Sequence, residues 1–521
     1  MLVADQTPPA SLARLADEAF SRNGDHDALI FEERTYRAAE LVERARRAAA
    51  GLTALGVQRG DRVAVVMANC PEVLITYNAI WRAGAVVTPV VFLVPPPELR
   101  HILVDSGAVA VVTTTELLGN VQMAADGTDS VRHIVVAGEL DPTAADPRLV
   151  SFATVEAHAE QPLQDVAASA LAAVMYTGGT TGRAKGVMLT HHNLATCGRS
   201  LWEVAHVPGI TVSLTPLPLS HAYGMIVVVA GMHEVEPGLA VVQRWFNPAE
   251  WIALCERHRV QRSSLVPAMI QMLLAEPLED ADLSSLRYVG SGAAPLAEDV
   301  LREFERRVPG CEIHEGYGCT ESGAVISANP PGRRRVGSVG LPIRDYTVRV
   351  IDERDEPLPP GQDGEICVRG PGVMLGYWNA AHETAAALRG DWLHTGDIGH
   401  VDSDGYLYIV DRKKDLILRG GFNVFPRDVE DVLLSHPDVE MAGVVGRPDA
   451  RLGEEVVAFV SLRAGATAGA EDLVGFARAR LAATKYPREI HIVASIPLTS
   501  VGKLDRKALR AQLAGRETQP I

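Results

Sequence analysis

Short runs rich in Val, Ile and Ala recur through the first three quarters of the chain and alternate with longer amphipathic stretches. Continuous apolar runs between helical segments indicate strands buried on both faces, because a half-exposed strand alternates apolar with polar residues. The sequence therefore predicts an α/β fold in which mixed or parallel sheets are flanked by helices. Examples of the predicted strands are residues 62–67, 108–114, 133–137 and 171–176.

The length of the chain, 521 residues, exceeds what one ordinary hydrophobic core organises. We therefore expect a large, multi-lobed N-terminal domain over residues 1–411. The last hundred or so residues have a different pattern, which predicts a small α+β domain over residues 412–521. Its expected elements are a helix at 426–436, strands at 439–445 and 454–462, a helix near 471–481, a strand at 490–495 and a basic helix from Asp505.

The composition, with 47% hydrophobic and 22% charged residues, is typical of a globular protein. A net charge of −16 argues against a nucleic-acid partner. The six cysteines form no CxxC pair and are too few for a disulfide framework. The N-terminus lacks the apolar run of a signal peptide, and the longest uncharged apolar stretch, 224–232, is too short to span a bilayer. We therefore expect a cytoplasmic protein with no membrane span.

A glycine-rich segment, MYTGGTTGRAKG, occupies residues 175–186 directly after a predicted strand. Glycines let a backbone turn its N–H groups toward an anion, while hydroxyl and ammonium groups add donors and charge. The segment matches neither the P-loop pattern, since no glycine directly precedes Lys185, nor the dinucleotide pattern G-x-G-x-x-G. It indicates a triphosphate site, with a flexible surface turn as the alternative. The candidate phosphate ligands are Thr177, Gly178, Gly179, Thr180, Thr181, Gly182 and Lys185.

Residues 176–186 resemble the signature loop of the adenylate-forming superfamily, which comprises acyl-CoA synthetases, adenylation domains of peptide synthetases and luciferases. That loop usually reads [YF]-T-S-G-T-T-G-x-P-K-G. Two positions depart from it, because Gly178 stands in place of the serine and Ala184 in place of the proline. Loss of the serine hydroxyl removes one donor but keeps the backbone donors, so it bears on the rate more than on the reaction.

Two later segments, GSGAAPL at 290–296 and GYGCTE at 316–321, resemble the adenine and phosphate motifs of the superfamily. The resemblance implies that Tyr317 stacks on the adenine and that Glu321 holds Mg²⁺, a cation that accepts carboxylate and phosphate oxygens. Taken alone, the first segment reads as a small-residue turn and the second as a helix N-cap. The nucleotide-binding residues implied here are Gly292, Ala293, Ala294, Gly316, Tyr317, Gly318 and Thr320.

The resemblance continues across the boundary between the two predicted domains. Asp397, in LHTGDIG, and Arg412 correspond to residues that reach the ribose hydroxyls. On composition alone, the charged run at 411–415 reads as solvated surface. It resembles the hinge of the superfamily, with Lys414 at the pivot, and the resemblance implies that the small domain moves. Beyond it, Gly420 and Gly421 leave room for the pantetheine arm of coenzyme A.

Two residues complete the implied site. Lys503, in PLTSVGKLDRK, resembles the lysine that reaches the carboxylate and the α-phosphate during adenylation. His221, in PLPLSHAYGM, resembles a histidine beside the acyl substrate, although a core histidine is the alternative. The residues expected to act in catalysis are Lys503, Thr177, Lys185, Glu321 and His221.

The resemblance thus implies a carboxylate–CoA ligase that uses ATP, Mg²⁺ and coenzyme A and passes through an acyl-AMP. No acidic residue lies between Thr215 and Met232 to pair with a substrate ammonium, so an uncharged aliphatic or aryl acid fits better than an amino acid. The alternatives are transfer to a carrier-protein thiol or another nucleophile, adenylation followed by oxidation as in luciferases, and a nucleotide-binding protein without catalysis. The oligomeric state stays open between a monomer and a homodimer.

Overall fold

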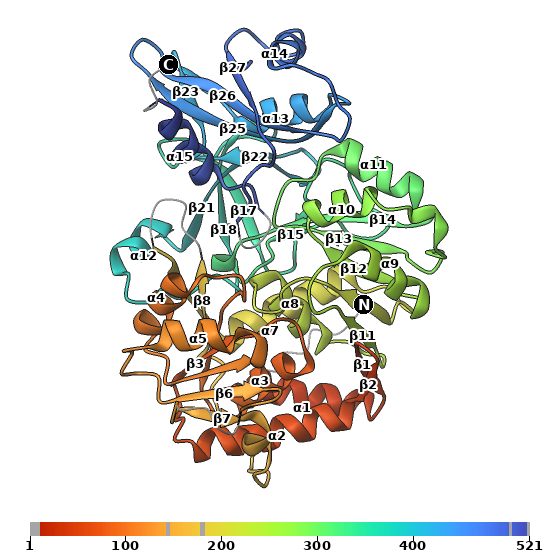
Figure 1. The fold of residues 1–521 in the computed structure, drawn as a ribbon, viewed down its shortest axis with the longest axis vertical. Helices are drawn as coiled ribbons and strands as arrows, with labels where there is room; N and C mark the ends of the chain where they lie inside the picture. Colours follow the sequence, from red (N-terminus) through yellow and green to blue (C-terminus); the bar gives the residue numbers. More distant parts are fainter. Residues whose placement is uncertain (1–10, 142–145, 178–182, 500–502, 518–521) are drawn as a thin grey trace.

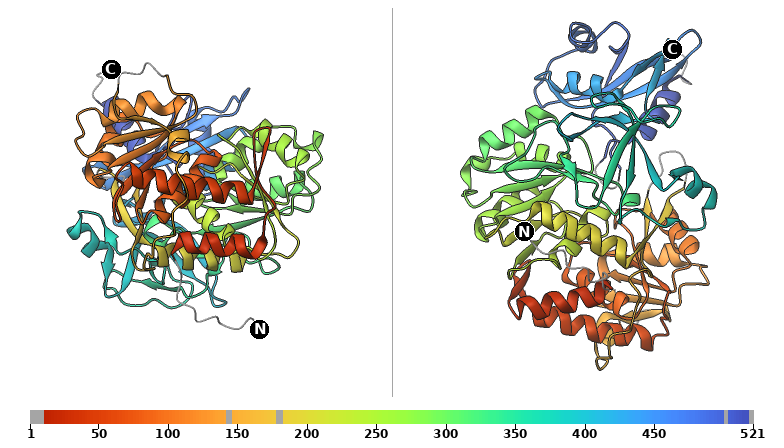
Figure 2. Two further views of the ribbon diagram at one scale, coloured as in Figure 1. Left: turned by 90° about the horizontal axis from the view of Figure 1, so that it is seen from below. Right: turned by 180° about the vertical axis from the view of Figure 1, so that it is seen from behind.

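A computed structural model describes residues 11–141, 146–177, 183–499 and 503–517. Three sheets build the large domain and a fourth builds the smaller C-terminal domain. The C-terminal domain lies at one end of the long axis, opposite α1 (Leu12–Asn23) and α2 (Ala38–Ala54), and the view from behind agrees (Figures 1 and 2).

The first sheet has eight strands, of which six are parallel and the two at one edge antiparallel. The expected parallel strands are confirmed, with ends that differ by a residue or two. The strands, in spatial order, are β19 (Gly376–Tyr377), β9 (Lys185–Thr190), β8 (Leu171–Thr177), β4 (Val86–Pro89), β3 (Arg62–Val66), β5 (Ala110–Thr114), β6 (His133–Ala137) and β7 (Leu149–Ser151).

The second sheet has nine strands with a parallel centre and antiparallel edges. In spatial order they are β16 (Leu341–Pro342), β15 (Ser327–Ala328), β14 (Glu312–Tyr317), β13 (Tyr288–Ser291), β12 (Arg262–Leu265), β10 (Val212–Thr215), β11 (Leu239–Val242), β1 (Asp27–Phe31) and β2 (Arg34–Arg37).

Helices cover both faces of these two sheets, as continuous apolar strands require. The largest buried cluster joins the two sheets and includes Trp81 and Leu194 from the helices between them. Separate clusters fill the outer faces. The helices are α3 (Pro71–Arg82), α4 (Pro96–Ser106), α5 (Leu118–Ala125), α6 (Phe152–Glu156), α7 (His191–Ala205), α8 (Ala222–Gly231), α9 (Pro248–Arg257), α10 (Pro267–Leu274) and α11 (Glu298–Arg307).

A third, wholly antiparallel sheet follows the second and was not foreseen from the sequence, which predicted continued α/β alternation there. The helix α12 (Ala381–Ala387) lies beside it. Its strands are β17 (Thr347–Ile351), β18 (Gly364–Arg369), β20 (Leu388–Arg389), β21 (Trp392–Val401) and β22 (Leu407–Arg412).

The C-terminal sheet begins five residues after β22 and matches the expected α+β pattern closely. Two of its helices, α13 and α15, both pack on β25. The elements are β23 (Ile417–Arg419), β24 (Phe422–Val424), α13 (Pro426–Leu434), β25 (Val439–Asp449), β26 (Gly453–Leu462), α14 (Ala470–Arg478), β27 (Glu489–Ile492) and α15 (Arg506–Glu517). None of the helices in the described part of the chain has both the length and the apolar character needed to cross a membrane.

Candidate active site

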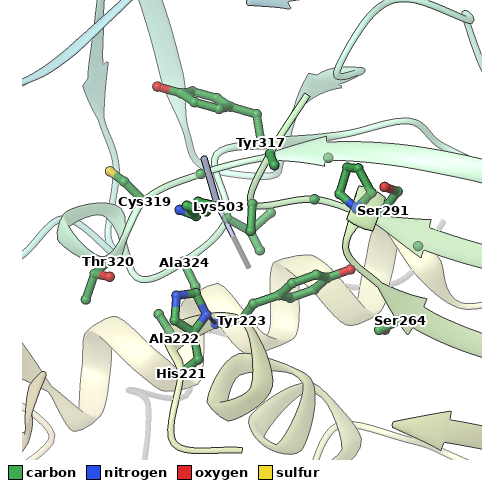
Figure 3. A pocket seen from close by; sticks show the side chains of 18 of the residues that line it. His221, Ala222, Tyr223, Ser264, Ser291, Tyr317, Cys319, Thr320, Ala324 and Lys503 are labelled. Atoms are coloured by element: carbon green, nitrogen blue, oxygen red, sulfur yellow. Dashed lines mark hydrogen bonds between the residues drawn. The ribbon is translucent and has the colours of Figure 1, made fainter. Parts of the chain in front are cut away.

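A cavity of about 1010 Å³ lies where the C-terminal domain faces the large domain. Parallel strands β13 and β14 of the second sheet end at its wall, and α8 begins there. The carboxyl ends of parallel strands are the usual place for a ligand in α/β proteins, since loops and helix N-termini converge at that edge. Figure 3 shows this cavity with side chains from both domains projecting into it.

Most of the residues predicted from sequence meet in this one cavity, although they come from widely separated motifs. Gly420 and Gly421 do not line it, because they lie in the exposed turn between β23 and β24. Residues Gly178, Gly179, Thr180, Thr181 and Gly182 lie outside the described residues. Those that line the cavity are Thr177, Lys185, His221, Gly292, Ala293, Ala294, Gly316, Tyr317, Gly318, Thr320, Glu321, Asp397, Arg412, Lys414 and Lys503.

One end of the cavity is organised around the buried carboxylate of Asp397. Asp397 and Arg412 are register partners on β21 and β22, and Arg412 Nε lies 3.1 Å from Asp397 Oδ1. The Tyr317 hydroxyl donates to Asp397 Oδ2 over 2.6 Å. Burial and the nearby Asp397 raise the pKa of Tyr317 well above its usual value, so this hydroxyl stays a donor. Asp397 is thereby fixed as an acceptor for a hydroxyl-bearing ligand.

A second cluster contains Glu321, Lys185 and Tyr377. The Tyr377 hydroxyl donates to Glu321 Oε1 over 2.9 Å, and Lys185 Nζ lies 4.4 Å from the centre of the Tyr377 ring. That distance suits a cation–π contact. Tyr377 is not predictable from the sequence, because its position depends on the pairing of β19 with β9, which no local pattern reveals.

Glu321 is the candidate metal ligand, and the donor set around it can be tested against Mg²⁺. In the part of the chain that the structure describes, no three His, Cys, Asp or Glu side chains gather as a metal-binding cluster. Mg²⁺ often needs only one or two carboxylates when phosphate oxygens and water complete its shell. A single cavity-lining carboxylate that Tyr377 holds in place therefore fits a magnesium ion that arrives with a triphosphate.

Lys503 projects into the middle of the cavity, between Tyr317 and His221 (Figure 3). Its main chain is fixed, because Thr499 N–H donates to the Lys503 carbonyl over 2.7 Å and Lys503 N–H donates to Thr499 Oγ1 over 3.1 Å. Burial, and then the positive charge of Arg412, lower the pKa of Lys503. The ammonium group is therefore poorly solvated, and a bound anion would stabilise it.

His221 caps the N-terminus of α8, where its Nδ1 accepts from Tyr223 N–H over 3.2 Å. Burial, and then the charge of Lys503, lower the pKa of His221 to about 3. The ring is therefore neutral near pH 7, and because Nδ1 accepts, the proton sits on Nε2. His221 lines the cavity and offers it one neutral donor, which a histidine enclosed in the core would not.

Comparison with known proteins accounts for this arrangement. The model of the family described as AMP-binding enzyme matches residues 16–378, which is more than half of the chain. This protein belongs to the AMP-binding enzyme family. The model of the AMP-binding enzyme C-terminal domain matches residues 428–503, a span that ends at Lys503.

Relatives of this AMP-binding enzyme match along nearly the whole chain. Feruloyl-CoA synthase of Amycolatopsis sp is 37% identical over 509 residues, which is 96% of this chain and 97% of that protein. Long-chain-fatty-acid–CoA ligase of Bacillus subtilis is 34% identical and covers 98% of this chain and 95% of that protein. The crystal structure of ATP-bound MatB from Rhodopseudomonas palustris superposes with a TM-score of 0.87 at 32% identity, over 96% of this chain and 98% of that one.

Proposed function

We propose that this AMP-binding enzyme activates a carboxylic acid with ATP and transfers the acyl group to coenzyme A. The observation that carries the proposal is the position of Lys503, which shares one cavity with the Tyr317–Asp397–Arg412 cluster. A protein that only bound a nucleotide would have no need of a desolvated lysine brought in from another domain. The similarity to a feruloyl-CoA synthase and a fatty-acid–CoA ligase over nearly the full length supports the proposal.

In the first half-reaction, an oxygen of the substrate carboxylate forms a bond to the α-phosphorus of ATP. The bond from that phosphorus to its bridging oxygen breaks, and pyrophosphate leaves with the electron pair. Asp397 accepts from the ribose hydroxyls, and Lys503 neutralises charge on the carboxylate and the α-phosphate. Such positioning and charge stabilisation supply most of the rate in phosphoryl transfer, so no side-chain nucleophile is required.

The phosphates lie, in this proposal, at the end of the cavity that carries Thr177, Lys185 and Glu321. Lys185 contributes charge, and Thr177 and Thr320 contribute hydroxyl donors. Glu321 would hold Mg²⁺, which would neutralise charge on the phosphate oxygens of ATP. The hydrogen bond from Tyr377 fixes the Glu321 carboxylate before the nucleotide binds.

In the second half-reaction, the sulfur of coenzyme A forms a bond to the acyl carbon and the bond from that carbon to AMP breaks. The thiol proton passes to solvent. Lys503 lines the cavity in which the acyl-AMP would lie, and the second step has no use for it. We therefore propose that residues 412–521 rotate against residues 1–411 about Lys414. Rotation would remove Lys503 and bring the exposed Gly420–Gly421 turn to the cavity.

The wall of the acyl end favours an uncharged acid, either aliphatic or aryl. On α8, Val227 and Val228 present an apolar surface. Ser264 and Gly290, which also line the cavity, are register partners on β12 and β13. The Tyr223 hydroxyl interacts with Ser264 (Figure 3). A Cβ added at Gly290 would lie 3.2 Å from the Tyr223 hydroxyl oxygen. Because these two hydroxyls already pair with each other, the wall requires no polar group on the acyl part of the substrate, and an uncharged aliphatic or aryl group can pack against the valines.

A substrate screen tests the proposal. The purified protein, MgATP and coenzyme A are incubated with phenylpropenoic acids with and without a ring hydroxyl, alkanoic acids and dicarboxylic acids, and AMP, acyl-AMP and acyl-CoA are measured by mass spectrometry. We expect acyl-CoA from uncharged acids, which should be preferred at least 10-fold in kcat/KM over the dicarboxylic acids. Acyl-AMP that accumulates without a thioester would instead favour a carrier protein or another nucleophile as acceptor. Absence of AMP with every acid would overturn the proposal.

A further inference from the structure

Helix α4 (Pro96–Ser106) lies beside the hairpin of β8 and β9 in the first sheet (Figure 1). The hairpin matters for the site, because its register partners Thr177 and Lys185 both line the cavity. The helix itself is firmly seated. Leu99, Ile102 and Leu103 are each 2% exposed or less and belong to the apolar cluster on that face of the sheet.

The polar face of α4 contacts both strands of the hairpin. His101 Nε2 lies 3.0 Å from the carbonyl oxygen of Ala184, just before β9, so Nε2 carries the proton and donates. On the other strand, the Tyr176 hydroxyl donates to Asp105 Oδ2 over 2.6 Å. Positions 101 and 105 are four residues apart, so the two side chains share one face of the helix. The His101 and Tyr176 rings also meet edge to face, with centres 6.4 Å apart.

Trp378 contacts both the hairpin and α4. Its N–H donates to the carbonyl of Gly186 on β9 over 2.6 Å. Its indole Nε1 donates to the main-chain carbonyl of Asp105 over 3.0 Å. The end of the hairpin is thus tied to the end of α4 both directly and through Trp378.

We infer that α4 acts as a clamp on the phosphate-binding hairpin and that His101 is a positioning residue for ATP. Ala184 precedes Lys185 directly, and an alanine leaves the φ angle free where a proline would fix it. The hydrogen bond from His101 to Ala184 removes that freedom and holds Lys185 in register with Thr177. This inference rests on the proposed function in one respect, which is that the anion held by the hairpin is the triphosphate of ATP. It does not depend on the later reaction, because the clamp would act when ATP binds.

The experiment compares three variants of the full-length protein. His101→Phe keeps a ring against Tyr176 but loses the donor, and His101→Gln keeps a side-chain N–H that can reach the same carbonyl. Arg100→Ala, on the exposed side of the same helix, is the matched control. ATP affinity is measured by calorimetry, the two half-reactions are measured separately with acid and with pre-formed acyl-AMP, and Tm reports folding.

We expect His101→Phe to weaken ATP binding and raise the KM for ATP about 5- to 20-fold, with thioester formation from acyl-AMP within twofold of wild type. His101→Gln should recover most of the ATP affinity, and Arg100→Ala should match wild type. The inference is overturned if His101→Phe binds ATP like wild type, if His101→Gln is no better than His101→Phe at equal Tm, or if both half-reactions fall together. Because ATP affinity is measured without an acid, a wild-type protein that binds ATP but adenylates nothing would refute the proposed function and leave the clamp testable.

Discussion

At the scale of single residues, the site depends on groups whose protonation is set by burial. His221 is neutral, Tyr317 keeps its proton, and Arg412 stays charged because Asp397 raises its already high pKa. Lys503 differs, since burial and the charge of Arg412 lower its pKa. Among these four side chains, Lys503 is therefore the one that loses its charge most easily as the pH rises above neutral.

The lowered pKa of Lys503 predicts a pH dependence for adenylation alone. A lysine with a depressed pKa is charged at low pH and loses its charge at a lower pH than an ordinary lysine, so acyl-AMP formation should decline as pH rises through that pKa. Lys503→Arg should move the decline to higher pH, because a guanidinium keeps its proton. Pyrophosphate release measured against pH checks this. An identical alkaline decline in both proteins would assign it to another group.

At the scale of elements, α8 lines the end of the cavity that we propose holds the acyl group. Its start is packed tightly, since a Cβ added at Gly224 would lie 2.1 Å from the carbonyl oxygen of Pro218. At the other end of the same helix, a Cβ added at Gly231 would meet no atom within 4 Å.

These two glycines predict opposite outcomes for the same substitution. Gly224→Ala should lower the free energy of unfolding by about 1–3 kcal/mol, because main chain has to move to admit the methyl group. It should also raise the KM for the acid, since Tyr223 would shift with the helix. Gly231→Ala should be neutral or slightly stabilising, as alanine favours helix over glycine. Thermal denaturation and acid kinetics check both, and equal effects would show that α8 is not fixed at its start.

Much of the architecture could be predicted at this scale, and the failures have physical reasons. The strands around Val63, Val111 and Val135 are continuous apolar runs, so they were found nearly to the residue. The sheet of β17 to β22 was not predicted. Its strands are only partly buried, so their apolar and polar residues form neither a continuous apolar run nor a regular alternation. Tyr377 and His101 were missed since their roles depend on contacts with distant segments, which a linear pattern does not contain.

At the scale of the whole molecule, residues of both domains line one cavity, and Lys503 is one of them in the described arrangement. Both half-reactions cannot use this arrangement if the thiol must reach the acyl carbon. The connection between β22 and β23 passes through Lys414, whose neighbour Lys413 is held to Glu365 at 2.9 Å. Any rotation has to be absorbed by main-chain torsions in this short segment.

Lys414→Pro tests that rotation, because proline fixes φ at this position. We expect acyl-AMP formation within about threefold of wild type and thioester formation from acyl-AMP reduced by about 100-fold or more. Lys414→Ala, which removes the side chain but not the torsional freedom, is the control and should retain both. Stopped-flow measurement of each half-reaction checks the prediction, and equal losses in Lys414→Pro and Lys414→Ala would point to the side chain.

The most direct test of the account is a single-turnover measurement of both half-reactions in wild type and Lys503→Ala. Loss of a charge that stabilises the transition state typically costs about 10²- to 10³-fold. The account predicts that Lys503→Ala loses acyl-AMP formation by this factor yet converts pre-formed acyl-AMP and coenzyme A to thioester within a few-fold of wild type. If the variant forms acyl-AMP at the normal rate, or loses both steps equally at unchanged Tm, Lys503 does not act in adenylation alone and the proposed mechanism is wrong.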